Sequence, residues 1–205
     1  MKVLVACEFS GIVREAFREK GHDVWSCDLL PSEIPGQHIQ GNVLEILEDG
    51  WWDLMIAHPP CTYLSRAANR VWNIPGREEK RREAMQFFMA LVNAPIERIC
   101  VENPVGFPNT EYRKPDQIIH PYYFGCAEKK RTCLWLKGLP KLIYENEDTL
   151  FSKRTSVVVF PARISKNGKK YWFSEAISGK KKSKERSRTF RAIAKAMAEQ
   201  WGKER

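Results

Sequence analysis

Residues 2–21 read KVLVACEFSGIVREAFREKG, and this stretch decides the fold of the first half of the chain. Lys2–Cys7 is a continuous apolar run rich in valine, which is typical of a parallel strand buried on both faces. A Ser-Gly pair follows, and apolar residues then recur at helical spacing from Ile12 to Phe17, before Gly21 ends the pattern. A strand, a glycine-bearing turn and an amphipathic helix together form the repeating unit of α/β proteins.

The same unit recurs further along the chain. Apolar runs predict strands at Asp23–Cys27, Asp53–Ala57, Arg98–Val101 and Thr132–Leu136, and a long amphipathic helix runs from about Arg77 to Val92. We therefore predict an α/β fold of the Rossmann-like type, with a mostly parallel sheet and helices on both faces. The less regular remainder is predicted as loop over residues 108–125, a possible strand over Ser156–Phe160, an irregular basic run over Gly179–Arg188, and a closing helix over Thr189–Trp201.

Composition narrows the class of protein. Apolar residues make up 43% of the chain, enough for a buried core, yet no run of eighteen apolar residues exists to form a membrane span. The six cysteines form no C-x-x-C pair, so we expect no structural zinc site or other metal. Several cysteines sit inside strand-like runs, where a reduced thiol acts as a small apolar group. We expect a cytoplasmic protein, since that compartment is reducing, and favour a monomer.

The positive charge is concentrated at one end of the chain. Residues 151–205 hold 16 Lys and Arg against 4 Asp and Glu, a net charge of +12, which leaves −3 for residues 1–150. Aromatic residues are interleaved with these cations at Tyr171, Trp172 and Phe173. This pattern favours a nucleic-acid partner, although a solvated basic tail would give the same count.

In an open parallel sheet, ligands bind beyond the carboxyl ends of the strands. The first predicted strand ends at Phe9-Ser10-Gly11, where a glycine lets the backbone approach a ligand or simply makes a tight turn. Asp28 ends the second strand and is suited to accept hydrogen bonds from ribose hydroxyls, or to cap a loop. Neither a G-x-G-x-x-G nor a G-x-x-x-x-G-K-[ST] motif is present, which favours an adenosyl cofactor without a pyrophosphate.

Two further strand ends carry reactive side chains. The run DLMIA (53–57) ends at His58-Pro59-Pro60-Cys61, and the two prolines make a rigid exit that holds a thiol at the sheet edge. A thiol in that position can act as a nucleophile once it is deprotonated. His58 is either a base or a structural imidazole. Glu102 ends the next strand, and we expect it to stay protonated or to share a proton there, which suits it to bind a ring nitrogen.

Taken together, these residues resemble the cytosine-5 DNA methyltransferase family, most closely its small phage and prophage members. The resemblance covers most of residues 1–140. It is based on the sequences HPPCTYLS, VENPVG and RTCLWLKGLP. The matching positions are the cofactor loop at Phe9, Ser10 and Gly11, the ribose acid Asp28, a third motif at Gly41, Asn42 and Val43, the Pro-Cys motif at Pro59, Pro60 and Cys61, the Glu-Asn motif at Glu102 and Asn103, and a basic motif within residues 128–131.

The resemblance implies S-adenosylmethionine as cofactor, bound by Phe9, Ser10, Gly11, Asp28, Asn42, Val43 and Pro59. It implies that Cys61, mounted on Pro60, adds covalently to a cytosine that has been flipped out of DNA. Glu102 would hold the base, and Lys130 or Arg131 would bind it and lower the pKa of the thiol. DNA contacts are expected at Arg66, Arg70, Lys180, Lys181, Lys182 and Arg186, the first two on a loop over residues 62–75 that resembles the family's mobile active-site loop.

The chain departs from the family pattern in several places. Val13 stands where the family has a second glycine, Thr62 follows the nucleophile in place of glutamine, and the basic residues near position 130 align in more than one register. Little chain separates Leu139 from the closing helix, so the family's large target-recognition domain does not fit. We therefore expect a catalytic core over 1–140, a reduced basic DNA-binding segment over 141–188, and a helix over 189–205 that packs on the core.

Three functions remain open at this point. The leading one is a DNA cytosine-5 methyltransferase. The second keeps the cofactor and the thiol but acts on a nucleotide or RNA, and the third is a catalytically degenerate fold that only binds DNA.

Overall fold

A computed structural model of the 205-residue chain describes residues 1–48, 52–66, 73–144, 159–172 and 182–203. Its framework is one seven-stranded sheet with the strand order β3-β2-β1-β4-β5-β7-β6. The strands are β1 (Lys2–Ala6), β2 (Asp23–Asp28), β3 (His38–Gln40), β4 (Leu54–Ala57), β5 (Arg98–Pro104), β6 (Gln117–Ile119) and β7 (Thr132–Lys137). The first five are parallel, whereas β7 runs antiparallel to both of its neighbours.

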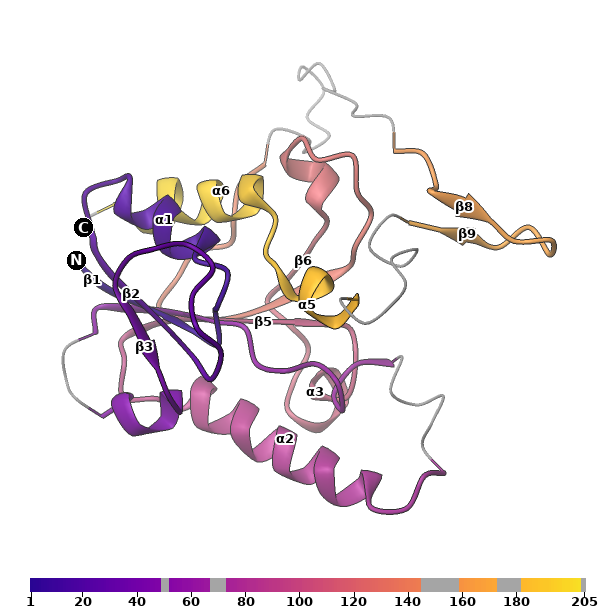
Figure 1. Ribbon diagram of the computed structural model, residues 1–205, viewed down its shortest axis with the longest axis horizontal. Helices are drawn as coiled ribbons and strands as arrows, with labels where there is room; N and C mark the ends of the chain where they lie inside the picture. The colour runs from indigo at the N-terminus through magenta and orange to yellow at the C-terminus, as the bar shows by residue number, and fades with distance from the viewer. Residues whose placement is uncertain (49–51, 67–72, 145–158, 173–181, 204–205) are drawn as a thin grey trace.

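Helices cover both faces of this sheet, as Figure 1 shows. Alternate residues of β1 divide between the two layers, with Val3 and Val5 on one side and Leu4 and Ala6 on the other. The first side packs against α1 (Ile12–Arg18) and α6 (Arg191–Trp201), and the second against α2 (Arg77–Val92) and the 3₁₀ turn η1 (Val43–Ile46). Apolar burial on both faces explains why the strands read as continuous hydrophobic runs.

The predicted fold class is confirmed at this level, as a mostly parallel α/β sheet between helical layers. The helix expected from Arg77 to Val92 has those ends, and the expected strands lie where the apolar runs placed them. The prediction was wrong between residues 108 and 125, where the structure has α3 (Pro108–Glu111), strand β6 and the 3₁₀ turn η3 (Pro121–Phe124) instead of loop. Strands of three residues such as β3 and β6 are too short to show a period in the sequence.

Beyond β7, a two-stranded hairpin, β8 (Arg163–Ile164) and β9 (Lys170–Tyr171), stands away from the body of the molecule (Figure 1). The strand considered over residues 156–160 falls largely outside the described residues. Part of the basic run expected to be irregular forms the short helix α5 (Lys182–Ser187). Helix α6 then returns to the core beside α1, with Met197 and Trp201 fully buried.

A buried arginine organises the connection from β2 to β3. Arg14, on α1, is fully buried and pairs with Glu15. Its guanidinium donates to Ser26 Oγ at 2.9 Å and to the carbonyl oxygen of Ile34 at 2.6 Å. Further acceptors are Ser32 Oγ and the carbonyl oxygens of Pro35 and Gln37. One side chain thus fixes a loop that has little apolar packing of its own.

Within the described ranges, no helix combines the length and apolar character needed to cross a lipid bilayer.

Candidate active site at the carboxyl edge of the sheet

The order in which successive strands are added to the sheet reverses between β1 and β4. From β1 the strands proceed outward through β2 to β3, and from β4 they proceed the other way to β5. Such a switch point opens a crevice at the carboxyl edge, where ligands of open α/β sheets bind. Glu8 and His58 follow the ends of β1 and β4 at this edge, and Glu102 lies within the last residues of β5.

The segment Pro59-Pro60 carries Cys61 clear of the sheet. The backbone N–H of His58 still donates to the Ala6 carbonyl at 2.9 Å, and the two prolines then supply no further donors. Asn103, from the end of β5, donates through Nδ2 to the Pro59 carbonyl at 2.8 Å. This bond ties the proline exit of β4 to the neighbouring strand and leaves Cys61 exposed at the edge.

The residues after Cys61 are joined by backbone hydrogen bonds to those after β5. A turn returns the N–H of Ser65 to the Cys61 carbonyl at 2.9 Å, and the N–H of Phe107 donates to the Leu64 carbonyl at 2.7 Å. Gly106 lies at this crossing, where a Cβ atom would overlap the Leu64 carbonyl oxygen. Only glycine permits so close an approach of two backbones. The sequence contained this signal in the glycine of VENPVGF, but the crossing itself was not predicted.

Glu102 and His58 form a pair beside Cys61. Nδ1 of His58 lies 3.0 Å from Oε2 of Glu102, and the His58 side chain is only 7% exposed. Burial acts to raise the pKa of Glu102, but the His58 hydrogen bond and the charge of Lys130 outweigh it and hold that pKa below its usual value. The lowered pKa of Glu102 disfavours the alternative in which this carboxyl group keeps its own proton, and the hydrogen bond to His58 is the arrangement in which the two side chains share one.

Opposing charges act on the thiol of Cys61. Its pKa is raised, first because packed atoms shield the sulfur from water although the residue as a whole is exposed, and then because Glu102 is anionic. Lys130 and Arg186 act in the opposite direction and favour the thiolate. A neutralised Glu102 would leave these two cations as the main charges near the sulfur.

Of the two basic residues proposed near position 130, the structure brings Lys130 to the thiol. Its charge acts on both Cys61 and Glu102, and its Nζ donates to the Arg186 carbonyl at 3.2 Å. Arg131 is exposed, and its charge acts on His120 and Cys133. The charge that acts on the thiol is that of Lys130 and not that of Arg131, which favours Lys130 for the role that the sequence left open between them.

The loop after β1 is occupied by a carboxylate of the chain itself. Glu8 is buried and accepts from the N–H groups of Val13 at 2.7 Å and Arg14 at 3.2 Å, at the start of α1. Ser10 donates its hydroxyl to Glu8 at 3.1 Å. A helix N-terminus filled in this way has no free donors for a phosphate. Glu8 was not predicted as a site residue, although the sequence places it shortly before the helix predicted from Ile12.

The other predicted cofactor residues divide into buried supports and exposed groups. Phe9 and Val43 are buried, and Asn42 caps η1 by accepting from the Leu44 N–H at 3.2 Å. A Cβ atom at Gly11, which has a φ of +72°, would meet the Arg14 guanidinium, so this glycine serves packing as well as the turn. Pro59 is also buried, whereas Pro60 is exposed beside Cys61.

Asp28 lies at the carboxyl end of β2, next to two exposed leucines. One oxygen, Oδ1, accepts from the Leu30 N–H at 2.9 Å. Leu29 is 72% exposed and Leu30 46% exposed, so a carboxylate and an apolar surface lie together here. That combination suits a ligand with hydroxyl groups and a flat apolar ring.

Ion pairs hold helix α5 and the residue after it against the carboxyl edge of the sheet. Glu33, on the loop held by Arg14, binds Arg188 through two contacts of 2.9 Å and Lys184 at 3.0 Å. These partners lower the pKa of Glu33 to about 2. The ammonium group of Lys184 also lies 5.0 Å from the centre of the Phe9 ring. The ordering of this basic run, which was not expected, follows from these contacts.

The predicted nucleic-acid residues are only partly described. Arg66 is exposed on the segment beyond Cys61, and Arg186 is exposed and near enough to influence the thiol. The backbone of Lys182 begins α5. Arg70, Lys180 and Lys181 lie outside the described residues.

Among the described residues, no group of three or more His, Cys, Asp and Glu side chains could hold a metal ion. No known protein-family model matches the chain, and no curated protein matches it either.

Proposed function

We propose that this chain is an S-adenosylmethionine-dependent methyltransferase that alkylates carbon 5 of cytosine in DNA, with Cys61 as the covalent nucleophile. One observation carries the proposal: the proline exit of β4, bonded to Asn103 at the end of β5, holds Cys61 close enough to Glu102 for the charge of that carboxylate to act on the thiol. A thiol beside a carboxylate that can hold a ring nitrogen is the pair that covalent attack on a pyrimidine requires.

The residues at the β1–β2 edge fit the cofactor. Asp28 can accept hydrogen bonds from a ribose, and the exposed side chains of Leu29 and Leu30 can cover an adenine ring. Glu8 leaves no room for a pyrophosphate at α1, and its negative charge favours a cationic ligand. When bound, S-adenosylmethionine supplies an electrophilic methyl group on a sulfonium centre.

Cys61 forms a bond from its sulfur to carbon 6 of the cytosine ring, after losing its proton. Lys130 and Arg186 stabilise the thiolate. The electron pair displaced from the carbon 5–carbon 6 double bond makes carbon 5 nucleophilic, and carbon 5 accepts the methyl group. Loss of the carbon 5 proton to a base then restores the double bond and expels the Cys61 thiolate.

Glu102 and His58 act at the opposite side of the ring. Glu102 accepts from the exocyclic amine, and a proton shared over its 3.0 Å hydrogen bond with His58 passes through the carboxyl group to the ring nitrogen. Glu102 returns to the carboxylate form in this step, and the ring nitrogen gives the proton back when the thiolate leaves. His58 is a positioning residue in this scheme, because it touches Glu102 and not the base.

The test is trapping of the covalent adduct. Duplex DNA with 5-fluorocytosine cannot lose a proton from carbon 5, so methyl transfer leaves the base attached to sulfur. We expect wild-type protein to give a stable adduct that requires S-adenosylmethionine, detected as a mass increase under denaturing conditions. Cys61→Ser should give none, while Cys126→Ser, a control at a half-buried thiol elsewhere, should match the wild type.

Three other outcomes would overturn the proposal in different ways. An adduct with a fluorinated nucleotide or RNA but none with duplex DNA would change the substrate. Cofactor binding without any adduct would indicate a different reaction, and DNA binding without cofactor binding would indicate a degenerate fold.

A further inference from the structure

The β8–β9 hairpin is a regular two-stranded ribbon. Arg163 pairs with Tyr171 and Ile164 with Lys170 in antiparallel register. The N–H of Ser165 donates to the Lys169 carbonyl at 2.9 Å, and Gly168, with a φ of +74°, closes the turn. A three-residue loop with a left-handed residue at its end is a common hairpin connection.

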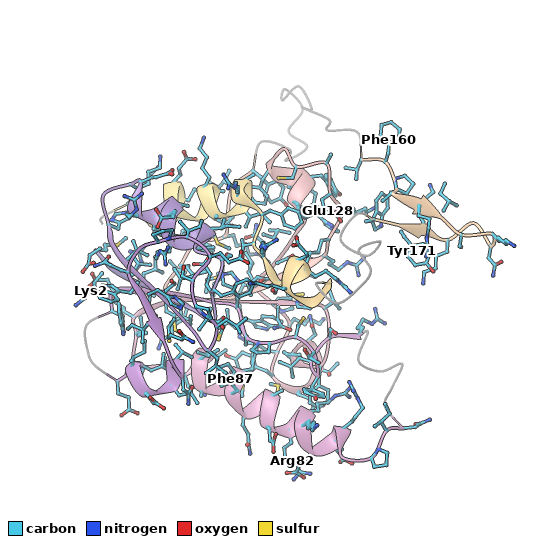
Figure 2. The ribbon with its side chains drawn as sticks, viewed as in Figure 1. Lys2, Arg82, Phe87, Glu128, Phe160 and Tyr171 are labelled. Atoms are coloured by element: carbon cyan, nitrogen blue, oxygen red, sulfur yellow. The ribbon has the colours of Figure 1, made fainter. Side chains whose placement is uncertain are left out.

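This ribbon has no apolar core beneath it. It stands away from the sheet and its helices (Figure 1), and most of its side chains are exposed. Phe160 is 77% exposed, and Ile164 is 57% exposed; Figure 2 shows Phe160 and Tyr171 on this projecting part. An isolated two-stranded hairpin is marginal in water, so a surface partner would add substantially to its order.

Cations stack on the one tyrosine of the ribbon. The Arg163 guanidinium lies 4.7 Å from the centre of the Tyr171 ring, and the Lys169 ammonium lies 5.2 Å from it. These contacts hold two positive charges on one face without neutralising them. The Tyr171 ring therefore supports both cations, and their charges remain available to an external anion.

The charge of the hairpin has one sign only. Residues 159–172 contain Arg163, Lys166, Lys169 and Lys170 and no acidic residue. Among the described residues, no carboxylate makes an ion pair with any of the four. A surface of this kind is complementary to a polyanion.

The base of the hairpin is connected to the candidate active site. The Lys129 ammonium lies 5.3 Å from the centre of the Trp172 ring, directly after β9. The next residue, Lys130, is the cation that acts on Cys61 and Glu102. A polyanion bound by the hairpin would therefore extend toward the Cys61 thiol along the positive charges of Lys129 and Lys130.

We propose that the β8–β9 hairpin lies in the major groove of duplex DNA beside the flipped cytosine and grips the phosphates on either side. This inference rests on the proposed function for the position of the flipped base. The major groove of B-form DNA is wide enough for a two-stranded ribbon, whereas that of A-form RNA is too deep and narrow. The cations bind phosphates, and Asn167 at the exposed tip is placed to reach a base edge.

The experiment measures binding of unmodified 20-base-pair DNA without cofactor, so it does not depend on methyl transfer. The hairpin variant carries Lys166→Gln, Lys169→Gln and Lys170→Gln. The matched control carries Lys114→Gln, Lys141→Gln and Lys195→Gln, exposed lysines on the body of the molecule, and so loses the same charge. Dissociation constants are measured by fluorescence anisotropy between 50 and 300 mM salt.

We expect the hairpin variant to bind duplex DNA at least about tenfold more weakly at 0.1 M salt, and the slope of log K against log salt to be shallower by about 2 to 3. The control should change much less in both quantities. Equal losses in the two variants, or none in either, would overturn the proposal. Hairpin-dependent binding of single strands or duplex RNA in preference to duplex DNA would also overturn it. If methyl transfer failed while the hairpin effect held, the proposed function and the position beside a flipped base would be lost, but the contact of the hairpin with duplex DNA would stand.

Discussion

The hydrogen bond between His58 and Glu102 is the residue-scale feature on which the proposed mechanism depends. The ionised form of Glu102 is favoured by the hydrogen bond to the His58 imidazole and by the charge of Lys130, despite the cost of burial. The other titratable groups that face it are thiols, Cys61, Cys100 and Cys133, whose pKa values are all raised. Among the described residues, the side chain hydrogen-bonded to this carboxylate is that of His58.

Replacement of His58 by leucine should slow adduct formation about a hundredfold, because Glu102 loses both its proton source and its orientation. The hydrogen bond now lowers the pKa of Glu102, so its removal should raise that pKa. The limb of the pH–rate profile that Glu102 controls should then move to higher pH.

His58→Asn is the matched comparison, because its amide can still donate to Glu102 but cannot carry a charge. We expect it to restore part of the rate and most of the position of that limb. Rates are measured as single-turnover adduct formation between pH 5 and 9. A rate loss in the leucine variant with an unchanged profile would mean that His58 has a structural role only.

At the level of elements, the site depends on two strand exits being locked together. The bond from Asn103 to Pro59 and the backbone crossing at Gly106 both join the end of β4 to the end of β5. Strand β5 is also longer than its apolar run, ending at Pro104 rather than Val101, so that Glu102 and Asn103 are held by pairing with β7. We therefore expect Cys61 and Glu102 to move as one unit.

Gly106→Ala should break that unit. The added methyl group would overlap the Leu64 carbonyl oxygen, so the turn that carries Cys61 must shift. We expect adduct formation to fall about a hundredfold, with a loss of about 1–3 kcal/mol in the free energy of unfolding. Ser65→Ala, which adds no atom at the same crossing, is the control for the rate and for urea denaturation. Wild-type rates in the alanine variant would show that the two exits move independently.

At the scale of the whole molecule, a series of polar contacts runs from α1 to the C-terminal segment. Arg14 fixes the loop that carries Glu33, and Glu33 in turn holds Arg188 and Lys184 across the sheet edge. The amino-terminal and carboxyl-terminal parts of the chain are thereby joined above the candidate site as well as through α6. Loss of Arg14 should therefore lower the stability of the whole fold.

Arg14→Met should lower the free energy of unfolding by about 3 kcal/mol or more, since several buried acceptors would lose their donor. Arg18→Met is the control on the same helix. Arg18 is 60% exposed and pairs only with Glu15, so its removal should cost less than about 1 kcal/mol. Chemical denaturation of both variants measures the difference. Similar stabilities would mean that the buried arginine is not needed to hold the loop.

The sequence was most informative where burial imposes a period. The strand runs at Val3–Ala6 and Leu54–Ala57 and the helix at Arg77–Val92 could be predicted because apolar packing repeats with the geometry of each element. The positions of Cys61 and Glu102 at neighbouring strand ends could also be predicted, because parallel strands end at one edge.

Contacts between distant segments left no comparable pattern in the sequence. The His58–Glu102 pair spans 44 residues and the Arg188–Glu33 pair spans 155, and neither follows from local spacing. The choice between Lys130 and Arg131 depended on which side chain faces the edge in three dimensions. The short strands β3 and β6 depend on their partners in the sheet and carry little signal of their own.

The carboxylate of Glu8 has a consequence for how the protein meets its ligand. Many nucleotide-binding loops remain incomplete until a phosphate arrives to satisfy the helix N-terminus, and the loss of loop entropy then reduces the affinity. Here Glu8 and Ser10 satisfy those groups from within the chain. We expect this loop to be ordered before any ligand binds, so that docking on this side of the crevice would cost little loop entropy.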